Sequence, residues 1–477
     1  MVFLSFEFYI AVTVCLGLYY LTPVRFRFGI LLAGSLGMYC CFSGRGILVL
    51  GAGILTGYLG GLALQTMRKR QVPQRDQKLC LAAGCLLALL PLLRNRFFQP
   101  AGGSLWQAIG LSYYTLQIVG YLADVYRGET PAEPNPAKYA LFLSFFPQIV
   151  QGPIPRYGQL GQQLFSGNRF SQEKFSKGLR WILWGFFLKM MIADRAGVIV
   201  DTVFGNWEIY TGDYVLTAGI LYSIQLYTDF MSCVFIARGT AMLFGVELGE
   251  NFTRPYFSDS VREFWGRWHI SLSSWLRDYI YIPLGGNRKG KVRKWINLTL
   301  VFAVSGVWHG SGYKYLAWGL LHAMYQVVGE ITREGRRKLY RAARIDREEL
   351  LAKILKKGST FFLVTLAWIL FRAESLRAGV QMLISLFTVR NPWIFFDDSL
   401  FSLGLDMKEA MVLLLSILLL LGVSYKQSRM KMQLGEWLGR QHLILRWGVY
   451  LAGILCIVVF GTYGYGFDAK DFIYGGF

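Results

Sequence analysis

The chain has 477 residues, of which 54% are hydrophobic and only 17% are charged, and its formal net charge is +21. This composition is more apolar and less charged than that of soluble globular proteins, so it excludes a secreted or cytosolic soluble protein. Apolar runs close to the roughly 20 residues that cross a ~30 Å hydrocarbon core recur along the whole chain. The composition therefore predicts an all-α polytopic integral membrane protein.

The positive charge has a membrane explanation. Lys and Arg residues gather in the loops between apolar runs, which is the positive-inside pattern of proteins that face anionic lipid and cytoplasm. We therefore expect no nucleic-acid partner. The seven cysteines lie in or beside apolar runs and form no CxxC pair, so neither disulfides nor a zinc site are predicted.

The first apolar run sets the orientation. Residues 1–21 lack a positive n-region and an A-x-A cleavage site, which indicates a retained first span and not a signal peptide. The loop after it carries Arg25 and Arg27, and a second basic loop follows at 67–78 on the same side. Two basic loops on one face predict a cytoplasmic side there and an N-terminus outside a multi-pass protein of the cell membrane.

The remaining spans follow from apolar run length and turn signals. We expect them at about 28–64 (two crossings broken at 43–46), 79–93, 105–122, 181–200, 214–234, 360–370, 409–423 and 447–460. Segment 145–160 holds three prolines and two glycines and cannot keep a continuous helix, which favours a re-entrant element over a plain interfacial loop. Ten Lys or Arg residues in 330–357 predict a basic cytoplasmic surface helix, and 426–440 is expected to be a basic loop.

Asp229 lies inside an apolar helix, in the sequence LYTDF. A carboxylate at the centre of a span costs about 2.5–3.5 kcal/mol on insertion scales, so it should face the protein interior and be hydrogen-bonded there. Lys189 and Asp194 lie partway along the preceding span. A functional and a purely structural role for Asp229 both remain open.

Three of the four histidines lie between 251 and 322. His269 belongs to an amphipathic segment, EFWGRWHISLSSWLRDYIYIPLGG, in which Trp268, Leu272, Trp275 and Tyr279 share one apolar face at helical spacing. This pattern predicts a helix at the membrane interface. The basic loop PLGGNRKG after it suits an anionic ligand, although basic loops beside spans are common.

His309 is flanked by Gly306, Gly310 and Gly312 in the run 298–321, where a helix can break or another backbone approach closely. A buried neutral imidazole within reach of a hydroxyl could act as general base for acyl transfer, and the alternative is a core histidine satisfied by hydrogen bonds. The sequence holds no G-x-S-x-G, P-loop or H-E-x-x-H motif. Two histidines without a carboxylate motif give little basis for a metal, so no metal site is predicted.

Several of these motifs together resemble the membrane-bound O-acyltransferase family. They are FFPQIVQGPIPRY at 145, LYTDF at 226, ENFTRPYFSDSVREFWGRWHISLSSWLRDYIYIPLGGNRKG at 250, SGVWHGSGYKYLAWGLLHA at 305, LAWILFRAESL at 366 and DFIYGGF at the C-terminal end. The similarity points to the bacterial branch with the membrane subunit of alginate O-acetyltransferase and, more distantly, the D-alanyl transfer protein of teichoic acid synthesis. One departure lies at 231–235, Met-Ser-Cys-Val-Phe, where Phe235 replaces a polar residue.

The resemblance implies a fold and a site. It implies about eleven transmembrane helices with re-entrant and interfacial helices around a central tunnel, as one domain over 1–477 with a catalytic core at 250–322. It makes His309 the catalytic residue and His269 the second family histidine, whereas His322 becomes a structural neighbour. We assign four further residues to the substrate tunnel: Trp268, Trp308, Ser305 and Asn287.

The resemblance also implies a reaction. We expect transfer of a short acyl group, most simply acetyl from acetyl-CoA bound as co-substrate on the cytoplasmic side, for O-acetylation of a cell-surface polysaccharide. No bound cofactor is expected. The chain is expected to contact the lipid bilayer, and its expected protein partner is an extracytoplasmic SGNH-like acetyltransferase. The alternatives are D-alanyl transfer from a carrier protein to teichoic acid and, from another class, a transporter of glycan precursors.

Overall fold

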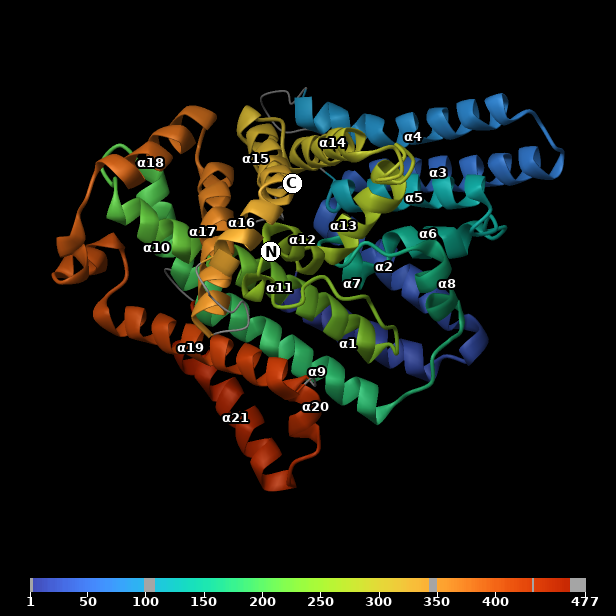
Figure 1. Ribbon diagram of the computed structural model, residues 1–477. Helices are drawn as coiled ribbons and strands as arrows, with labels where there is room; N and C mark the ends of the chain where they lie inside the picture. The colour runs from blue at the N-terminus through green and yellow to red at the C-terminus, as the bar shows by residue number, and fades with distance from the viewer. Residues whose placement is uncertain (1–2, 98–107, 343–349, 431–432, 464–477) are drawn as a thin grey trace. The chain divides into compact units, whose positions relative to one another are not determined.

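The computed structural model describes residues 3–97, 108–342, 350–430 and 433–463, and within these ranges it contains helices and no strands (Figure 1). Two compact units are present. The first, the N-terminal unit, comprises the described residues up to 185 together with 232–249. The second, the histidine unit, comprises 186–231 and the described residues from 250 onward, and it contains the whole predicted catalytic core.

The N-terminal unit is built from helices that match most of the predicted apolar runs. They are α1 Phe6–Leu21, α2 Arg27–Ser43, α3 Gly46–Lys69, α4 Gln74–Phe97, α5 Leu111–Arg127, α6 Pro136–Ser144, α7 Phe146–Ile149, α8 Tyr157–Phe165 and most of α9 Gln172–Phe187. The run 28–64 breaks where the sequence predicts, because Gly44 adopts a positive φ of 51° between α2 and α3. Residues 105–107 of the predicted fifth span lie outside the described residues.

The proline-rich segment 145–160 is broken, as predicted. After the four residues of α7 the chain runs without helix to Arg156, and α8 begins at Tyr157. Phe146, Gln148 and Gln151 are all buried. The segment is thus packed inside protein, as irregular backbone at membrane depth must be, and it is not an exposed loop.

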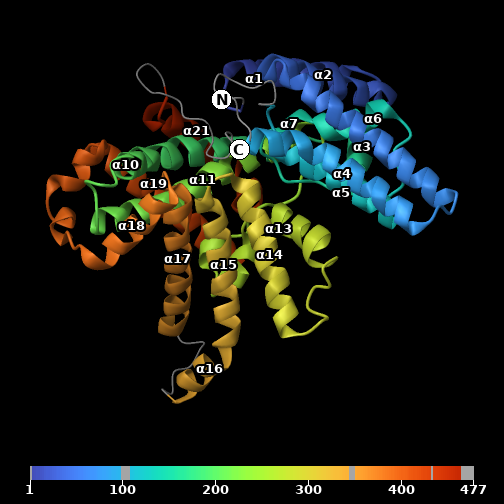
Figure 2. The same ribbon diagram turned by 90° about the horizontal axis from the view of Figure 1, so that it is seen from above.

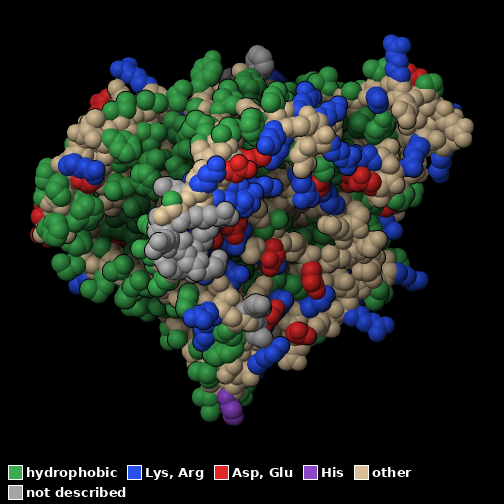
Figure 3. Space-filling view, viewed as in Figure 1, with side chains coloured by type: hydrophobic (Ala, Val, Ile, Leu, Met, Phe, Trp, Pro, Cys, Tyr) green, Lys and Arg blue, Asp and Glu red, His purple; other side chains and the backbone are tan. Residues whose placement is uncertain are grey.

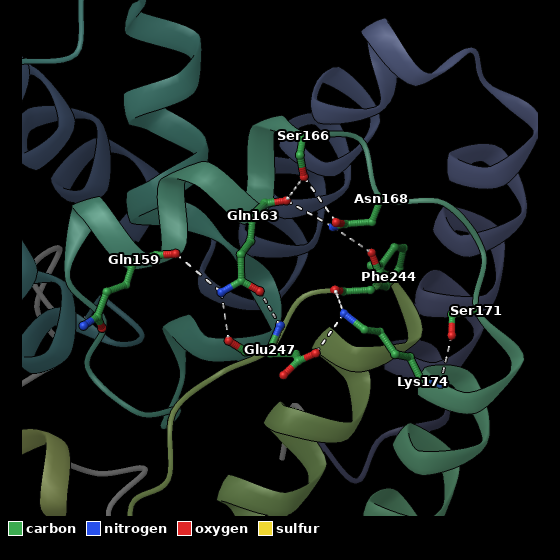
Figure 4. Close-up of polar contacts among 9 residues, drawn as sticks. Gln159, Gln163, Ser166, Asn168, Ser171, Lys174, Phe244 and Glu247 are labelled. Atoms are coloured by element: carbon green, nitrogen blue, oxygen red, sulfur yellow. Dashed lines mark hydrogen bonds and ion pairs between the residues drawn. The ribbon is translucent and has the colours of Figure 1, made fainter.

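A network of polar contacts connects the end of α8 with the chain after α11 (Asp213–Leu243), within the N-terminal unit (Figure 4). The Gln163 amide donates to the backbone oxygen of Glu247 and accepts from its backbone N–H, at 3.2 and 2.8 Å. Lys174 Nζ lies 2.8 Å from the Glu247 carboxylate. This hydrogen bond and the positive charge lower the pKa of Glu247 below its ordinary value.

The histidine unit holds the remaining helices. They are α10 Asp194–Gly205, the first part of α11, α12 Val261–Arg267, α13 Ile270–Leu276, α14 Lys291–His309, α15 Tyr313–Ile331, α16 Arg333–Ala342, α17 Leu350–Arg372, α18 Leu376–Thr388, α19 Met407–Met430, α20 Leu434–Gly439 and α21 Leu443–Phe460. A π-helical turn at Leu188–Ala193 precedes α10, so the predicted span 181–200 is a helix with an internal widened turn.

The apolar run 298–321 is broken after His309, where the flanking glycines indicate that a helix can break. The structure forms two helices there, α14 and α15, which turn back at residues 310–312 and lie side by side (Figures 1 and 2). A Cβ atom added at Gly306 would lie 2.4 Å from the Tyr315 carbonyl oxygen, and one at Gly319 would lie 2.2 Å from that of Phe302. The glycines therefore serve close packing of two antiparallel backbones.

Two elements of the structure differ from the sequence prediction. Helix α18 was not predicted, because its 13 residues are too few for a span and its polar positions interrupt the apolar run. Most of the expected basic loop at 426–440 is helical, since α19 continues to Met430 and α20 follows. In the basic segment 330–357, α16 and the start of α17 are helical, and residues 343–349 lie outside the described ranges.

Seven helical segments of the described chain are long and apolar enough to cross a membrane, and α1 and α18 are shorter apolar helices. The seven are 24–43, 46–69, 74–95, 213–243, 350–372, 407–430 and 443–460. α14 and α15 are not among them. Length and hydropathy thus support a polytopic membrane protein but do not by themselves reach the predicted number of about eleven spans.

Candidate active site

His309 is the last residue of α14 and is 2% exposed. Its imidazole lies among aromatic rings, with centroid distances of 4.8 Å to Trp308, 5.1 Å to Trp318 and 5.5 Å to Phe371. These rings come from α14, α15 and α17. The hairpin turn after His309 therefore ends the helix inside an apolar enclosure, where a polar side chain has little access to water.

His269 lies between α12 and α13 and is 1% exposed. Its backbone adopts the left-handed conformation, with φ 45° and ψ 54°, and it separates two helices that the sequence predicts as one. Neither ring nitrogen has a hydrogen-bond partner among the described residues. Burial lowers the pKa of His269 below its usual value, so the imidazole is neutral at pH 7.

The conformation at His269 is held by Asn251. The backbone oxygen of Asn251 accepts from the Ile270 N–H at 2.9 Å. Its side-chain oxygen accepts from the N–H and the hydroxyl of Ser271, at 3.0 and 2.7 Å. These contacts satisfy the first two free N–H groups of α13. The His269 side chain, at the N-cap position, makes no capping hydrogen bond to them.

The Trp308 ring lies beside both candidate histidines. Its centroid is 4.8 Å from that of His309 and 6.2 Å from that of His269. The second predicted tryptophan, Trp268, instead stacks on Phe264 at 5.4 Å and packs against Trp368 at 5.2 Å. The structure thus brings His269, Trp308 and His309 together and places Trp268 in the aromatic core beside them.

His322 has a structural environment, as the sequence interpretation holds. The Trp265 indole N–H donates to its Nδ1 at 3.2 Å. The ring packs edge-on against Trp318 at 5.2 Å and against Trp265 at 5.0 Å. His322 therefore forms part of the aromatic core behind His309.

A cavity of about 890 Å³ lies within the histidine unit. Its wall includes apolar residues and five serines, Ser260, Ser273, Ser274, Ser305 and Ser359. It also carries six cationic and two acidic residues: Arg262, Arg277, Lys294, Arg333, Arg336 and Lys356, with Asp259 and Glu330. Figure 3 shows Lys and Arg side chains gathered over α14 to α16, with Asp and Glu among them.

The cavity is formed by residues between the start of α12 and α17. Because they are far apart along the chain, the sequence alone did not predict it. Ser305 lines it, whereas His269, His309, Trp268 and Trp308 do not. Asn287 is exposed in the turn before α14 and also does not line it. Two acidic residues of the wall are paired, Glu330 with Lys294 at 2.6 Å and Asp259 with Lys357.

Asp229 is buried and paired, as predicted. Lys189 Nζ lies 2.7 Å from its carboxylate and 2.9 Å from that of Asp194, and all three side chains are no more than 6% exposed. Each of these residues is visible as a charge in an apolar run of the sequence, but the cluster is not, because the π-helical turn and α11 meet only in the fold. Next to Asp229, the Phe230 ring packs 4.8 Å from His269, so the cluster supports the helix that backs the site.

The departure at Phe235 lies elsewhere. Its ring packs 6.3 Å from Trp181 in the N-terminal unit. Among the described residues, no group of three or more His, Cys, Asp or Glu is placed to hold a metal ion.

The model of the MBOAT, membrane-bound O-acyltransferase family matches residues 105–371. A probable alginate O-acetylase of Pseudomonas putida is 36% identical over 81% of this chain and 80% of its own length. A peptidoglycan O-acetyltransferase of Helicobacter pylori is 33% identical over 58% of this chain and 56% of its length. A teichoic acid D-alanyltransferase of Streptococcus thermophilus is 29% identical over 55% and 66%. The chain therefore belongs to the membrane-bound O-acyltransferase family and is an O-acyltransferase.

Proposed function

We propose that this O-acyltransferase moves an acetyl group from acetyl-CoA to hydroxyl groups of a cell-surface polysaccharide. The observation that carries the proposal is the position of His269 and His309 beside Trp308, in the same unit as a cavity with a cationic wall. The names of the similar alginate and peptidoglycan enzymes support acetyl as the group and a polysaccharide as the acceptor.

His309 is the proposed general base. A neutral imidazole takes the proton of the acceptor hydroxyl while the hydroxyl oxygen attacks the thioester carbonyl carbon. The carbon–sulfur bond then breaks, and the proton passes from the imidazole to the leaving sulfur. Positioned proton transfer of this kind contributes about 10²- to 10⁴-fold to a rate. Ester and free thiol are the products.

His269 is the proposed orienting residue. Both of its ring nitrogens are buried without a described partner, so they are available to a substrate atom or to a water that links it to the reacting groups. The Trp308 ring lies beside both histidines and forms part of the proposed site. Trp268 takes a supporting place in the aromatic core, and the exposed Asn287 is left out of the proposed site.

The cavity is the proposed donor site. Ligand pockets for molecules of this size occupy about 300–1,000 Å³, and the volume here is about 890 Å³. Six cationic residues in its wall suit the phosphates of a nucleotide thioester, and the apolar residues suit the chain that leads to the sulfur. We assign donor entry to the cytoplasmic side, because basic loops between apolar spans favour that side of the membrane.

The proposal includes a location and a partner. We place the protein in the cytoplasmic membrane with its N-terminus outside, and we assign the acceptor side to the extracytoplasmic face. An SGNH-like acetyltransferase there is the proposed partner that receives the acetyl group for the polysaccharide.

The test measures alkali-released acetate and D-alanine on the cell envelope of the source bacterium. The gene is deleted and then complemented with the wild type, His309→Ala or His442→Ala. His442, the fourth histidine, is exposed at the start of α21 and serves as the matched control. We expect acetyl esters to disappear on deletion and to return with the wild type and His442→Ala but not with His309→Ala.

Other results would point elsewhere. If deletion removed D-alanine esters and left acetate unchanged, the transferred group would be D-alanyl and not acetyl. Acetate that depends on the gene but survives loss of both His269 and His309 would favour a transporter of a glycan precursor. Immunoblots of membrane fractions confirm that each variant is inserted.

A further inference from the structure

Ser305 stands out in the cavity wall. It lies one helical turn before His309 on α14, and residues four apart on a helix share a face. Its side chain is 1% exposed and lines the cavity, whereas His309 does not. Ser305 is therefore a polar group of the wall that lies next to the proposed base.

The Ser305 hydroxyl has no hydrogen-bond partner among the described residues. Serine and threonine inside helices commonly donate to the carbonyl four residues earlier, and Thr299 on the same helix does so to Trp295 at 2.9 Å. The other four serines of the wall each make a hydrogen bond. Ser273, Ser274 and Ser359 donate to the backbone oxygens of Trp268, Ser271 and Lys356, at 3.2, 2.9 and 3.0 Å. The Ser260 hydroxyl accepts from the Glu263 N–H at 3.2 Å.

A buried hydroxyl without a partner destabilises the protein that carries it, so such groups in native structures call for an explanation. Here the hydroxyl lies at the surface of a cavity that suits a thioester donor. A ligand atom that accepts a hydrogen bond would satisfy it. The donor's carbonyl oxygen is such an acceptor, and it must lie near His309 for transfer to occur.

We propose that the Ser305 hydroxyl donates a hydrogen bond to the thioester carbonyl oxygen of the acyl donor. This inference rests on the proposed function. When the acceptor oxygen bonds to the carbonyl carbon, the negative charge moves to the carbonyl oxygen, where the Ser305 hydrogen bond strengthens. The carbon–sulfur bond then breaks, the carbonyl re-forms, and the acceptor's proton reaches the sulfur through His309. Ser305 gives up no proton and forms no covalent bond.

The experiment compares Ser305→Ala and Ser305→Cys with the wild type in permeabilised membranes supplied with radiolabelled acetyl-CoA. Transfer to the endogenous acceptor is measured over a range of donor concentrations. The control is Ser144→Ala, because Ser144 is also fully buried with an unpartnered hydroxyl but lies in α6, outside the cavity. Thermal stability of each purified variant is measured in parallel.

We expect Ser305→Ala to lower kcat by about 10²- to 10³-fold, the effect of losing one oxyanion donor, with the KM for acetyl-CoA changed only a few-fold. Ser305→Cys keeps a weaker hydrogen-bond donor, so its kcat should lie between those of Ser305→Ala and the wild type. Ser144→Ala should match the wild type. Because no described hydrogen bond is lost, the thermal stability of Ser305→Ala should equal or exceed that of the wild type.

Three outcomes would overturn the inference. They are a kcat for Ser305→Ala within a few-fold of the wild type, an effect confined to KM, and a loss of thermal stability that accounts for the lost activity in both Ser305 variants. Absence of transfer by the wild-type membranes would instead contradict the proposed function, so the two failures are distinguishable.

Discussion

The α14–α15 hairpin and α21 are apolar helical elements of the same unit, but they differ in how much of their surface is buried in protein. In α21 the most apolar stretch has a mean hydropathy of 2.3 and none of it is buried in protein, so its side chains face lipid. The hairpin buries Ser305, His309, Trp318 and His322 against other helices. Hydropathy therefore identifies the helices whose side chains are exposed, whereas the helices of the proposed site are recognised by their glycines and polar residues.

The hairpin is most sharply tested at its closest contact. Gly306→Leu places a Cβ atom 2.4 Å from the Tyr315 carbonyl oxygen, which cannot move away without breaking α15. We expect destabilisation of at least about 3 kcal/mol and loss of the folded species on size-exclusion chromatography in detergent. Gly329→Leu, in α15 with open space around its Cβ position, is the control and should fold normally. Equal behaviour of the two variants would refute the close packing.

The next test removes the cation of the buried cluster. Lys189→Met leaves the carboxylates of Asp194 and Asp229 buried without their shared partner. We expect a loss of about 3–5 kcal/mol, measured by thermal or denaturant unfolding in detergent. Adding Asp194→Asn and Asp229→Asn removes the unpaired charges and should restore much of the stability. If the triple variant is no better than Lys189→Met, uncompensated charge is not the cause.

A lysine–carboxylate pair at the surface should contribute far less to the free energy of unfolding than the buried cluster does. Lys174 and Glu247 are 41% and 56% exposed, so Lys174→Met should cost about 0.2–1 kcal/mol at neutral pH. The folded pKa of Glu247 is lowered, so the pair stabilises the protein above the ordinary glutamate pKa of 4.5 and loses its effect as the pH falls. Wild-type and variant unfolding curves should therefore converge on acidification, and a difference that grows would contradict this sign.

The smallest effect is expected on the lipid face of α21. Leu455 is 61% exposed in the protein, so Leu455→Ala should change the free energy of unfolding by no more than about 0.5 kcal/mol. Leu455→Arg at the same position should be strongly unfavourable, by about 2.5–3.5 kcal/mol on an insertion scale. Yields of inserted protein in the membrane fraction report both changes. An arginine as well tolerated as the alanine would show that this face meets water.

Much of the fold could be predicted from local signals. The break at 43–46 follows from a turn sequence, the irregular segment 145–160 follows from its prolines, and the pairing of Asp229 follows from the cost of a bare carboxylate in an apolar helix. At 298–321 the glycines around His309 indicated a break or a close backbone approach, but they did not identify the partner. The structure supplies it, because Gly306 and Gly319 contact the opposite backbone of the α14–α15 hairpin.

The site was predictable in its residues and not in its arrangement. The sequence context of His269 and His309 identified them as candidates, and the fold adds that both lie beside the Trp308 ring. The cavity could not be predicted, since segments from 259 to 363 contribute to its wall. Apart from the family resemblance, the sequence marked Ser305 only as a hydroxyl residue four positions before a histidine in an apolar helix. Its proposed role becomes visible only when the structure shows that it lines the cavity.

The left-handed backbone of His269 determines how substitutions at this position should be interpreted. Histidine, asparagine and aspartate tolerate this conformation better than most residues, and β-branched residues tolerate it poorly. In a saturation mutagenesis screen, valine or isoleucine at 269 would combine a strained chain with a missing imidazole and so exaggerate the role of the ring. Asparagine keeps the backbone and removes only the imidazole. The ratio of its activity to that of valine would separate what the ring does from what the loop requires.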